Sequence, residues 1–154
     1  MVYGAILDKG ERFYTDMSKV ISALNGRVKD YNWLVTDYDF NEDFLIDGEY
    51  GFFTSEEFIK FANKPYFQWI WAVVSGFRKE IQLDEILKYP LPYANGYRGF
   101  WQNPLSIQHP LAEVEIVPWD SSLTLFISKH KDLVDMFRRA FPLSRDLAEY
   151  NSEV

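Results

Sequence analysis

The sequence contains no cysteine. This absence excludes a disulfide framework, a thiolate nucleophile and a zinc site built on cysteine, so noncovalent packing must hold the fold. Histidine is scarce too, with only His109 and His130, whereas a protein metal site ordinarily needs three ligands. We therefore expect no metal centre, and we interpret both histidines as ordinary surface or loop residues.

Long hydrophobic runs are also missing. No segment approaches the ~18 uninterrupted apolar residues that a membrane span requires. The N-terminal stretch 1–8 has no basic leader, and its apolar run is too short for a signal peptide. These features predict a cytoplasmic protein with no membrane partner.

Complete catalytic and cofactor motifs are absent. Residues 95–99, Asn-Gly-Tyr-Arg-Gly, contain too little glycine for a phosphate loop, and no Lys-Ser/Thr pair follows them. Ser121 and Ser122 lack the flanking glycines that expose a nucleophilic serine, and short polar residues are what a tight turn needs. We therefore expect neither a cofactor nor a serine-based active site.

Aromatic residues are abundant and make up 18% of the 154 residues. Each buries about 150–250 Å² when it enters a core or an interface. The hydrophobic content of 47% and the charged content of 25% are those of a globular protein. No repeat or low-complexity linker divides the chain, so we predict a single domain over residues 1–154.

Helical and strand patterns alternate along the chain. Apolar alternation or continuous apolar runs predict strands at 2–7, 32–38, 44–53, 66–77, 112–119 and 123–128. Apolar spacings of three and four, with capping signals, predict helices at 11–24, 55–63 and 133–141, a helical turn at 83–87 and a last short helix from 144 to 150. This order predicts an α+β domain with a mainly antiparallel sheet of about six strands and three to five helices.

Three segments carry more specific expectations. Strand 66–77 is apolar on both faces, which indicates a central strand covered on both sides. Strand 112–119 has Val114 and Ile116 on one face and Glu113 and Glu115 on the other, which indicates a half-exposed strand. The proline-rich segment 89–110 is predicted to be a long structured loop, a kind of segment that is disproportionately functional.

Acidic charge is concentrated in residues 30–59, which contain nine of the 23 carboxylates and no lysine or arginine. The other 14 nearly balance the 16 basic residues, so this segment sets the net charge of −7. Such a field favours a cationic partner and repels nucleic acid. The candidate contact carboxylates are Asp37, Asp39, Glu42, Asp43, Asp47 and Glu49.

The same carboxylates have two other interpretations. Asp37, Asp39 and Asn41 have the alternating spacing that opens a calcium loop, but Glu42 stands where that loop needs glycine, and Gly48 stands where it needs glutamate. A charged run is also commonly a solvated face with no partner at all.

Aromatic residues offer a second kind of site. Phe100 and Trp101 lie in the proline-rich loop, where we expect them to form an exposed interface hot spot. A platform of tryptophans could stack on sugars, although Trp69 and Trp71 lie in the predicted central strand and are better explained as core.

Several short stretches resemble those of the small cytoplasmic immunity proteins with which bacteria neutralise protein toxins. The stretches are Tyr31-Asn32-Trp33, Gly51-Phe52-Phe53-Thr54, Trp119-Asp120-Ser121-Ser122, and Ala140-Phe141-Pro142-Leu143 with Asp146-Leu147. The resemblance implies a noncatalytic protein that binds a toxin. It transfers no site residue, because these proteins share no single fold or binding signature.

Our leading hypothesis is therefore an acidic binding protein for a basic protein partner, with a nuclease toxin as the candidate partner. The alternative is a domain that binds carbohydrate or another small ligand through loop aromatics. A third hypothesis is a hydrolase that uses two carboxylates, Glu113 or Glu115 with Asp120.

Overall fold

The computed structural model describes residues 1–153. Its strands are β1 (Tyr3–Leu7), β2 (Tyr31–Phe40), β3 (Tyr50–Phe53), β4 (Trp69–Arg78), β5 (Val114–Trp119), β6 (Leu123–Ser128) and β7 (Arg145–Asp146). Its α-helices are α1 (Met17–Ala23), α2 (Ser55–Ala62), α3 (Leu83–Ile86), α4 (Lys131–Ala140) and α5 (Leu147–Ser152). Two short 3-10 turns, η1 (Arg27–Asp30) and η2 (Gly99–Trp101), complete the regular structure of the described residues.

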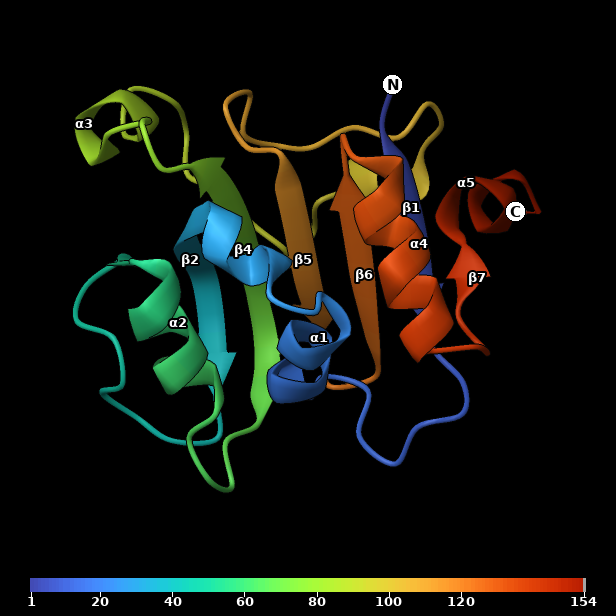
Figure 1. The fold of residues 1–154 in the computed structure, drawn as a ribbon, viewed down its shortest axis with the longest axis horizontal. Coiled ribbons are helices and arrows are strands. Elements are labelled where there is room, and N and C mark those ends of the chain that lie inside the picture. Colours follow the sequence, from blue (N-terminus) through green and yellow to red (C-terminus); the bar gives the residue numbers. More distant parts are fainter. Residues whose placement is uncertain (154) are drawn as a thin grey trace.

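Within residues 1–153 the seven strands form one antiparallel sheet in the order β3-β2-β4-β5-β6-β1-β7 (Figure 1). This confirms the predicted α+β class and the antiparallel sheet. The short edge strand β7, which pairs with β1, was not predicted. β4 lies between β2 and β5, so the prediction that it is an inner strand is also confirmed.

α1, β3 and β4 begin later than the sequence pattern predicts, and local geometry accounts for each difference. α1 begins at Met17 rather than at residue 11, since the Asp16 carboxylate caps it by accepting a hydrogen bond from Ser18 N–H at 3.1 Å. β3 begins at Tyr50 rather than at residue 44, and β4 begins at Trp69 rather than at residue 66. Phe44 and Tyr66 have left-handed backbone angles (φ 64° and 58°) that a strand does not accept.

Helices α1, α2 and α4 cover one face of the sheet, the front face in Figure 1. Trp33 from β2 stacks on Phe58 from α2 with ring centroids 5.1 Å apart, and Phe40 meets Trp69 edge to face at 5.0 Å. Trp33 and Phe58 are fully buried. α2 is held in place by the predicted capping box, in which Thr54 and Glu57 bond each other's backbone N–H groups.

The opposite face is covered mainly by residues 89–110, which we call the rear segment, together with α5. Ala94 and Phe100 of this segment are 1% exposed and pack against Val73, Val117 and other rear-facing strand residues. The expectation that strand 112–119 is half-exposed is therefore wrong. Glu115 and Val117 lie under the rear segment rather than in solvent, whereas Glu113, just before β5, pairs with Arg78 and His130.

A carboxylate ties the rear segment to the sheet. Asp37 of β2 accepts hydrogen bonds from the backbone N–H groups of Ala94 at 2.7 Å and of Asn95 at 3.2 Å. Charge-assisted bonds of this kind are stronger than neutral ones. Asp37 therefore has a structural role, and its carboxylate is already engaged.

The structure predicts very different stabilities for two matched phenylalanine substitutions. Phe58→Ala removes a buried ring stacked on Trp33 and should lower the free energy of unfolding by about 3–5 kcal/mol. Phe44→Ala removes a ring that is wholly in solvent and should change it by at most about 0.5 kcal/mol. Urea denaturation monitored by tryptophan fluorescence measures both. Equal losses in the two variants would contradict the packing described above.

Candidate functional site

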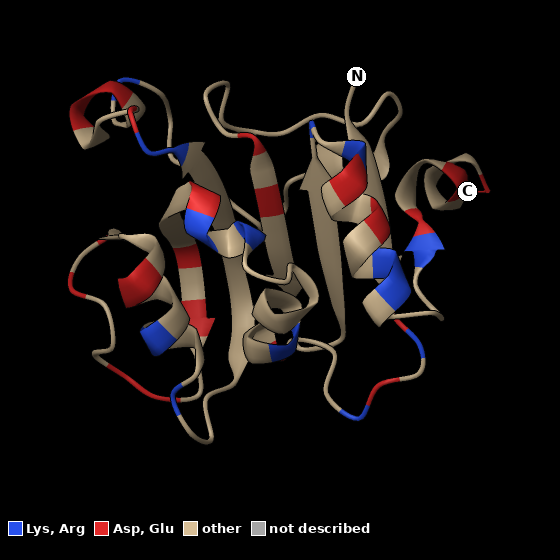
Figure 2. Ribbon diagram, in the orientation of Figure 1, with Lys and Arg blue, Asp and Glu red and all other residues tan. Residues whose placement is uncertain are grey.

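Exposed carboxylates gather on one segment, residues 39–49, which we call the acidic segment. It comprises the end of β2 and the connection to β3, and acidic residues recur along both parts (Figure 2). Its five carboxylates are all exposed to solvent: Asp39, Glu42, Asp43, Asp47 and Glu49. Glu42 pairs with Lys64 at 3.2 Å, but the other four form no ion pair within residues 1–153. These five carboxylates are thus in solvent, as the binding hypothesis requires, whereas the Asp37 carboxylate is bonded to the rear segment.

Phe44 stands in the middle of the acidic segment and is 101% exposed. Its φ of 64° is a conformation that bulky residues rarely adopt, at a cost on the order of 1 kcal/mol. The sequence pattern predicted this residue inside a strand. The Asp47-Gly48 pair, a turn signal, could have indicated that the strand begins later, and Gly48 does have a left-handed φ of 86°.

The acidic segment is anchored on the C-terminal side of Phe44. The hydroxyl of Tyr38 donates to the carbonyls of Ile46 and Gly48. Leu45 and Ile46 pack against the front core. An exposed aromatic ring, flanked in the sequence by carboxylates, is therefore presented on an ordered scaffold.

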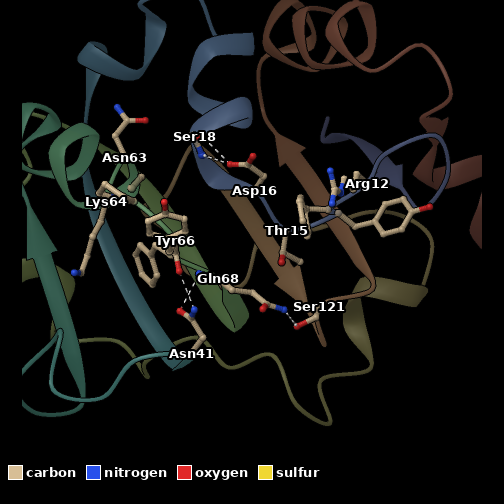
Figure 3. A pocket seen from close by; sticks show the side chains of 15 residues that line it. Arg12, Thr15, Asp16, Ser18, Asn41, Asn63, Lys64, Tyr66, Gln68 and Ser121 are labelled. Carbon is tan, nitrogen blue, oxygen red and sulfur yellow. Dashed lines mark hydrogen bonds between the residues drawn. The ribbon is translucent and has the colours of Figure 1, made fainter.

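A cleft of about 530 Å³ adjoins this segment, and sequence reasoning did not predict it. It lies between the residues before and within α1, the turn 63–68 that precedes β4, and the β5–β6 turn (Figure 3). Its polar lining includes Asp16, Gln68 and Ser121, and the Gln68 side-chain amide donates to the Ser121 hydroxyl at 3.0 Å. No motif in the sequence brings these residues together, because they come from three separate segments.

The side chain of Asn41 fixes one wall of the cleft. Its amide nitrogen donates to the Tyr66 carbonyl at 2.8 Å, and its amide oxygen accepts from Gln68 N–H at 2.9 Å. This clamp holds Tyr66 in its left-handed conformation with the side chain 98% exposed. It also argues against the calcium loop, since Asn41 and Asp37 are both occupied by protein groups.

Phe100 and Trp101 do not form an exposed hot spot, so that expectation is wrong. Phe100 is 1% exposed, and Trp101 is half-buried against Phe100, Trp119 and Tyr150. The reason is that the rear segment packs onto the sheet and turns these rings inward. Phe100 and Trp101 therefore help to form the rear core.

The carboxylates of the hydrolase hypothesis are not brought together. Glu113 and Asp120 flank opposite ends of the six-residue strand β5, which spans about 20 Å, whereas paired catalytic carboxylates lie roughly 5–9.5 Å apart. Glu113 contacts Arg78 and His130 instead. Glu115 points the other way, under the rear segment.

Glu115 is a buried acid. Its side chain is 0% exposed, Gln108 N–H donates to Oε2 at 3.0 Å, and Oε1 has no hydrogen-bond partner within residues 1–153. Burial raises its pKa to about 8. Sequence alternation placed Glu115 in solvent, because nothing in the strand itself reveals that a distant segment covers it.

The two histidines have structural partners. His109 is a loop residue, one of the two kinds of position expected for it, but it is buried there, and its ring bonds the Ile86 carbonyl at 2.8 Å and Leu111 N–H at 3.1 Å. Burial lowers its pKa. His130 precedes α4 and bonds Glu113. Across the described chain, no three potential metal ligands converge.

Comparisons with protein families, with curated proteins and with solved structures give no match. Among the helices of residues 1–153, none is both long and apolar enough to cross a membrane. The site must therefore be interpreted from its own geometry.

The buried acid predicts a specific dependence of stability on pH. Because the pKa of Glu115 is about 8 in the folded state and near its ordinary 4.5 when unfolded, unfolding releases a proton between these values. The contribution of Glu115 to stability should thus fall as pH rises from about 4.5 to 8 and be lost fully above that range. Thermal unfolding of the wild type and of Glu115→Gln across this range measures it.

The Glu115→Gln variant should show a flatter profile of melting temperature against pH, since an amide cannot ionise. Glu49→Gln, at an exposed position, serves as the matched control and should follow the wild type. Parallel pH profiles for Glu115→Gln and the wild type would contradict the assigned ionisation.

Proposed function

We propose that the protein is a noncatalytic binding protein that docks a basic protein partner on its acidic segment, and that the partner is a bacterial toxin. One observation carries the proposal. A fully exposed phenylalanine, Phe44, stands on one anchored connection, with Asp39 and Asp43 before it in the sequence and Asp47 and Glu49 after it. These four exposed carboxylates form no ion pair within residues 1–153. The resemblance to immunity proteins supplies the class of partner, and that class acts in the cytoplasm.

The charge arrangement suits rapid capture of a cationic surface. A concentrated negative patch raises the rate of encounter with a positive partner by orders of magnitude at low salt. The carboxylates stay solvated in the free protein, so the free protein bears no cost of burying them. A nuclease toxin is a suitable partner, because an enzyme that cleaves nucleic acid carries a basic cleft for its substrate.

Phe44 is a candidate source of binding affinity, which surface charge alone does not provide. Rim charges mainly tune the association rate, whereas buried aromatic anchors dominate affinity. A solvent-exposed ring held in a strained backbone conformation has no role in the core of the free protein. Burial of this ring against a partner would remove its apolar surface from water, and the free energy gained would offset the cost of the strained backbone.

Charge reversal on the acidic segment tests the proposal. Asp39→Lys, Glu42→Lys and Asp43→Lys combined should lower the rate of association with the product of the adjacent gene, the partner to be tested, by about 10-fold or more at low salt. They should also flatten its salt dependence, because the attraction that salt screens is gone. Stopped-flow or biosensor kinetics at several ionic strengths measure both quantities.

The matched control reverses three exposed carboxylates on other elements, Glu80, Asp84 and Glu149. This control changes the net charge by the same amount and should alter the rate far less. If the two triple variants slow association equally, the net charge and not the acidic segment governs binding. An unchanged rate in the first variant would rule out charge steering.

A further inference from the structure

The cleft beside α1 has the lining of a ligand site rather than of a packing defect. Its volume of about 530 Å³ lies within the roughly 300–1,000 Å³ range typical of small-molecule sites. Figure 3 shows the hydrogen-bonded pair Asp16–Ser18 on one side of the space and the pair Gln68–Ser121 on another. Polar groups from separate segments thus converge on one hollow.

The charges of the cleft do not favour an ionic ligand of either sign. Arg12 brings a positive charge and Asp16 a negative one. Lys64 is already paired with Glu42 at 3.2 Å. A polyanion such as a nucleic acid would meet Asp16, and a polycation would meet Arg12, so the lining is best matched by a neutral polar molecule.

The hydrogen-bonding groups of the cleft both donate and accept. Asp16 uses one carboxylate oxygen, Oδ1, to accept from Ser18 N–H and the Ser18 hydroxyl, and its Oδ2 has no partner within residues 1–153. The Ser121 oxygen accepts from Gln68, which leaves the serine proton to donate. Adjacent donors and acceptors match hydroxyl groups, each of which does both.

A strained and exposed tyrosine forms part of the same wall. Tyr66 is 98% exposed at a φ of 58°. The Asn41 amide holds its turn in that conformation by donating to the Tyr66 carbonyl and accepting from Gln68 N–H. Phe13, 63% exposed, also lines the cleft and lies under the Arg12 guanidinium at 5.4 Å. Strain retained around an exposed ring points to a role for that ring outside the core.

From these observations we infer that the cleft binds a saccharide, with a pyranose ring stacked on Tyr66 and its hydroxyls bonded to Asp16, Gln68 and Ser121. A pyranose combines an apolar face, which suits an aromatic ring, with neutral hydroxyls, which suit the mixed polar lining. The site is independent of the proposed protein partner. It uses none of the unpaired carboxylates of the acidic segment. Only Asn41 of that segment lines the cleft, and Glu42 reaches the site only through its pair with Lys64.

The test is a titration of the isotope-labelled protein, monitored by its backbone amide signals, with maltotriose, cellotriose and N,N′,N″-triacetylchitotriose in turn. At least one trisaccharide should shift the amides of Thr15, Gln68 and Ser121 and saturate with a dissociation constant on the order of 1 mM or tighter. If none of the three shifts these amides at concentrations on the order of 10 mM, the inference is wrong.

Two variants separate the cleft from nonspecific binding. Tyr66→Asn removes the ring while tolerating the left-handed turn, and it should weaken binding about 10-fold. Tyr93→Ala removes a tyrosine that is 48% exposed on the rear segment and should leave the affinity unchanged. Equal affinities of the wild type and Tyr66→Asn would overturn the inference.

Two further probes cover other occupants. N-acetyl-L-tyrosinamide stands for a peptide side chain, and inorganic phosphate stands for an anion. If either of them shifts the cleft amides and no trisaccharide does, the cleft takes that class of ligand and the saccharide inference is overturned. Because these titrations involve no protein partner, they are unaffected by the outcome of the charge-reversal experiment.

Discussion

The packing of aromatic rings between α2 and the strands β2 and β4 is the interaction on which the rest of the structure depends. Trp33, Phe40, Phe58 and Trp69 form one continuous contact beneath the helix. Each fully buried ring of this kind contributes several kcal/mol to the free energy of unfolding. This contact fixes the end of β2, where the acidic segment begins, and the start of β4, where the cleft lies. Without it neither surface would have a defined shape.

Charge is distributed unevenly on this scaffold. Away from the acidic segment, many carboxylates are paired with a basic side chain. The pairs include Arg27 with Asp30 and Asp132, Lys19 with Glu11, Lys131 with Asp135, and Arg145 with Asp8. Such exposed pairs contribute little to stability, but they cancel the local field. The acidic segment has one such pair, Glu42 with Lys64, so most of its charge remains available to attract a partner.

Local signals in the sequence predicted local structure well. The capping box of Thr54 and Glu57 located the start of α2, and the polar turn 120–122 located the β5–β6 hairpin. Long-range coverage could not be predicted in this way. Whether residues 89–110 return across the rear of the sheet depends on contacts far apart in the chain, such as Asp37 with Ala94. The positions of Phe100 and Glu115, which were expected outside and lie inside, both follow from that return.

The candidate surface shows the same division. The acidic segment could be recognised from the sequence. The left-handed backbone and exposed side chains of Phe44 and Tyr66 could not, because aromatic residues in an alternating pattern ordinarily indicate a strand.

Hydrogen exchange of the complex with the basic partner tests the central claim most directly. We expect new protection of amides in residues 39–49 and little change in α4 and α5. Protection confined to α4, α5 or the rear segment, with the acidic segment unchanged, would contradict the account.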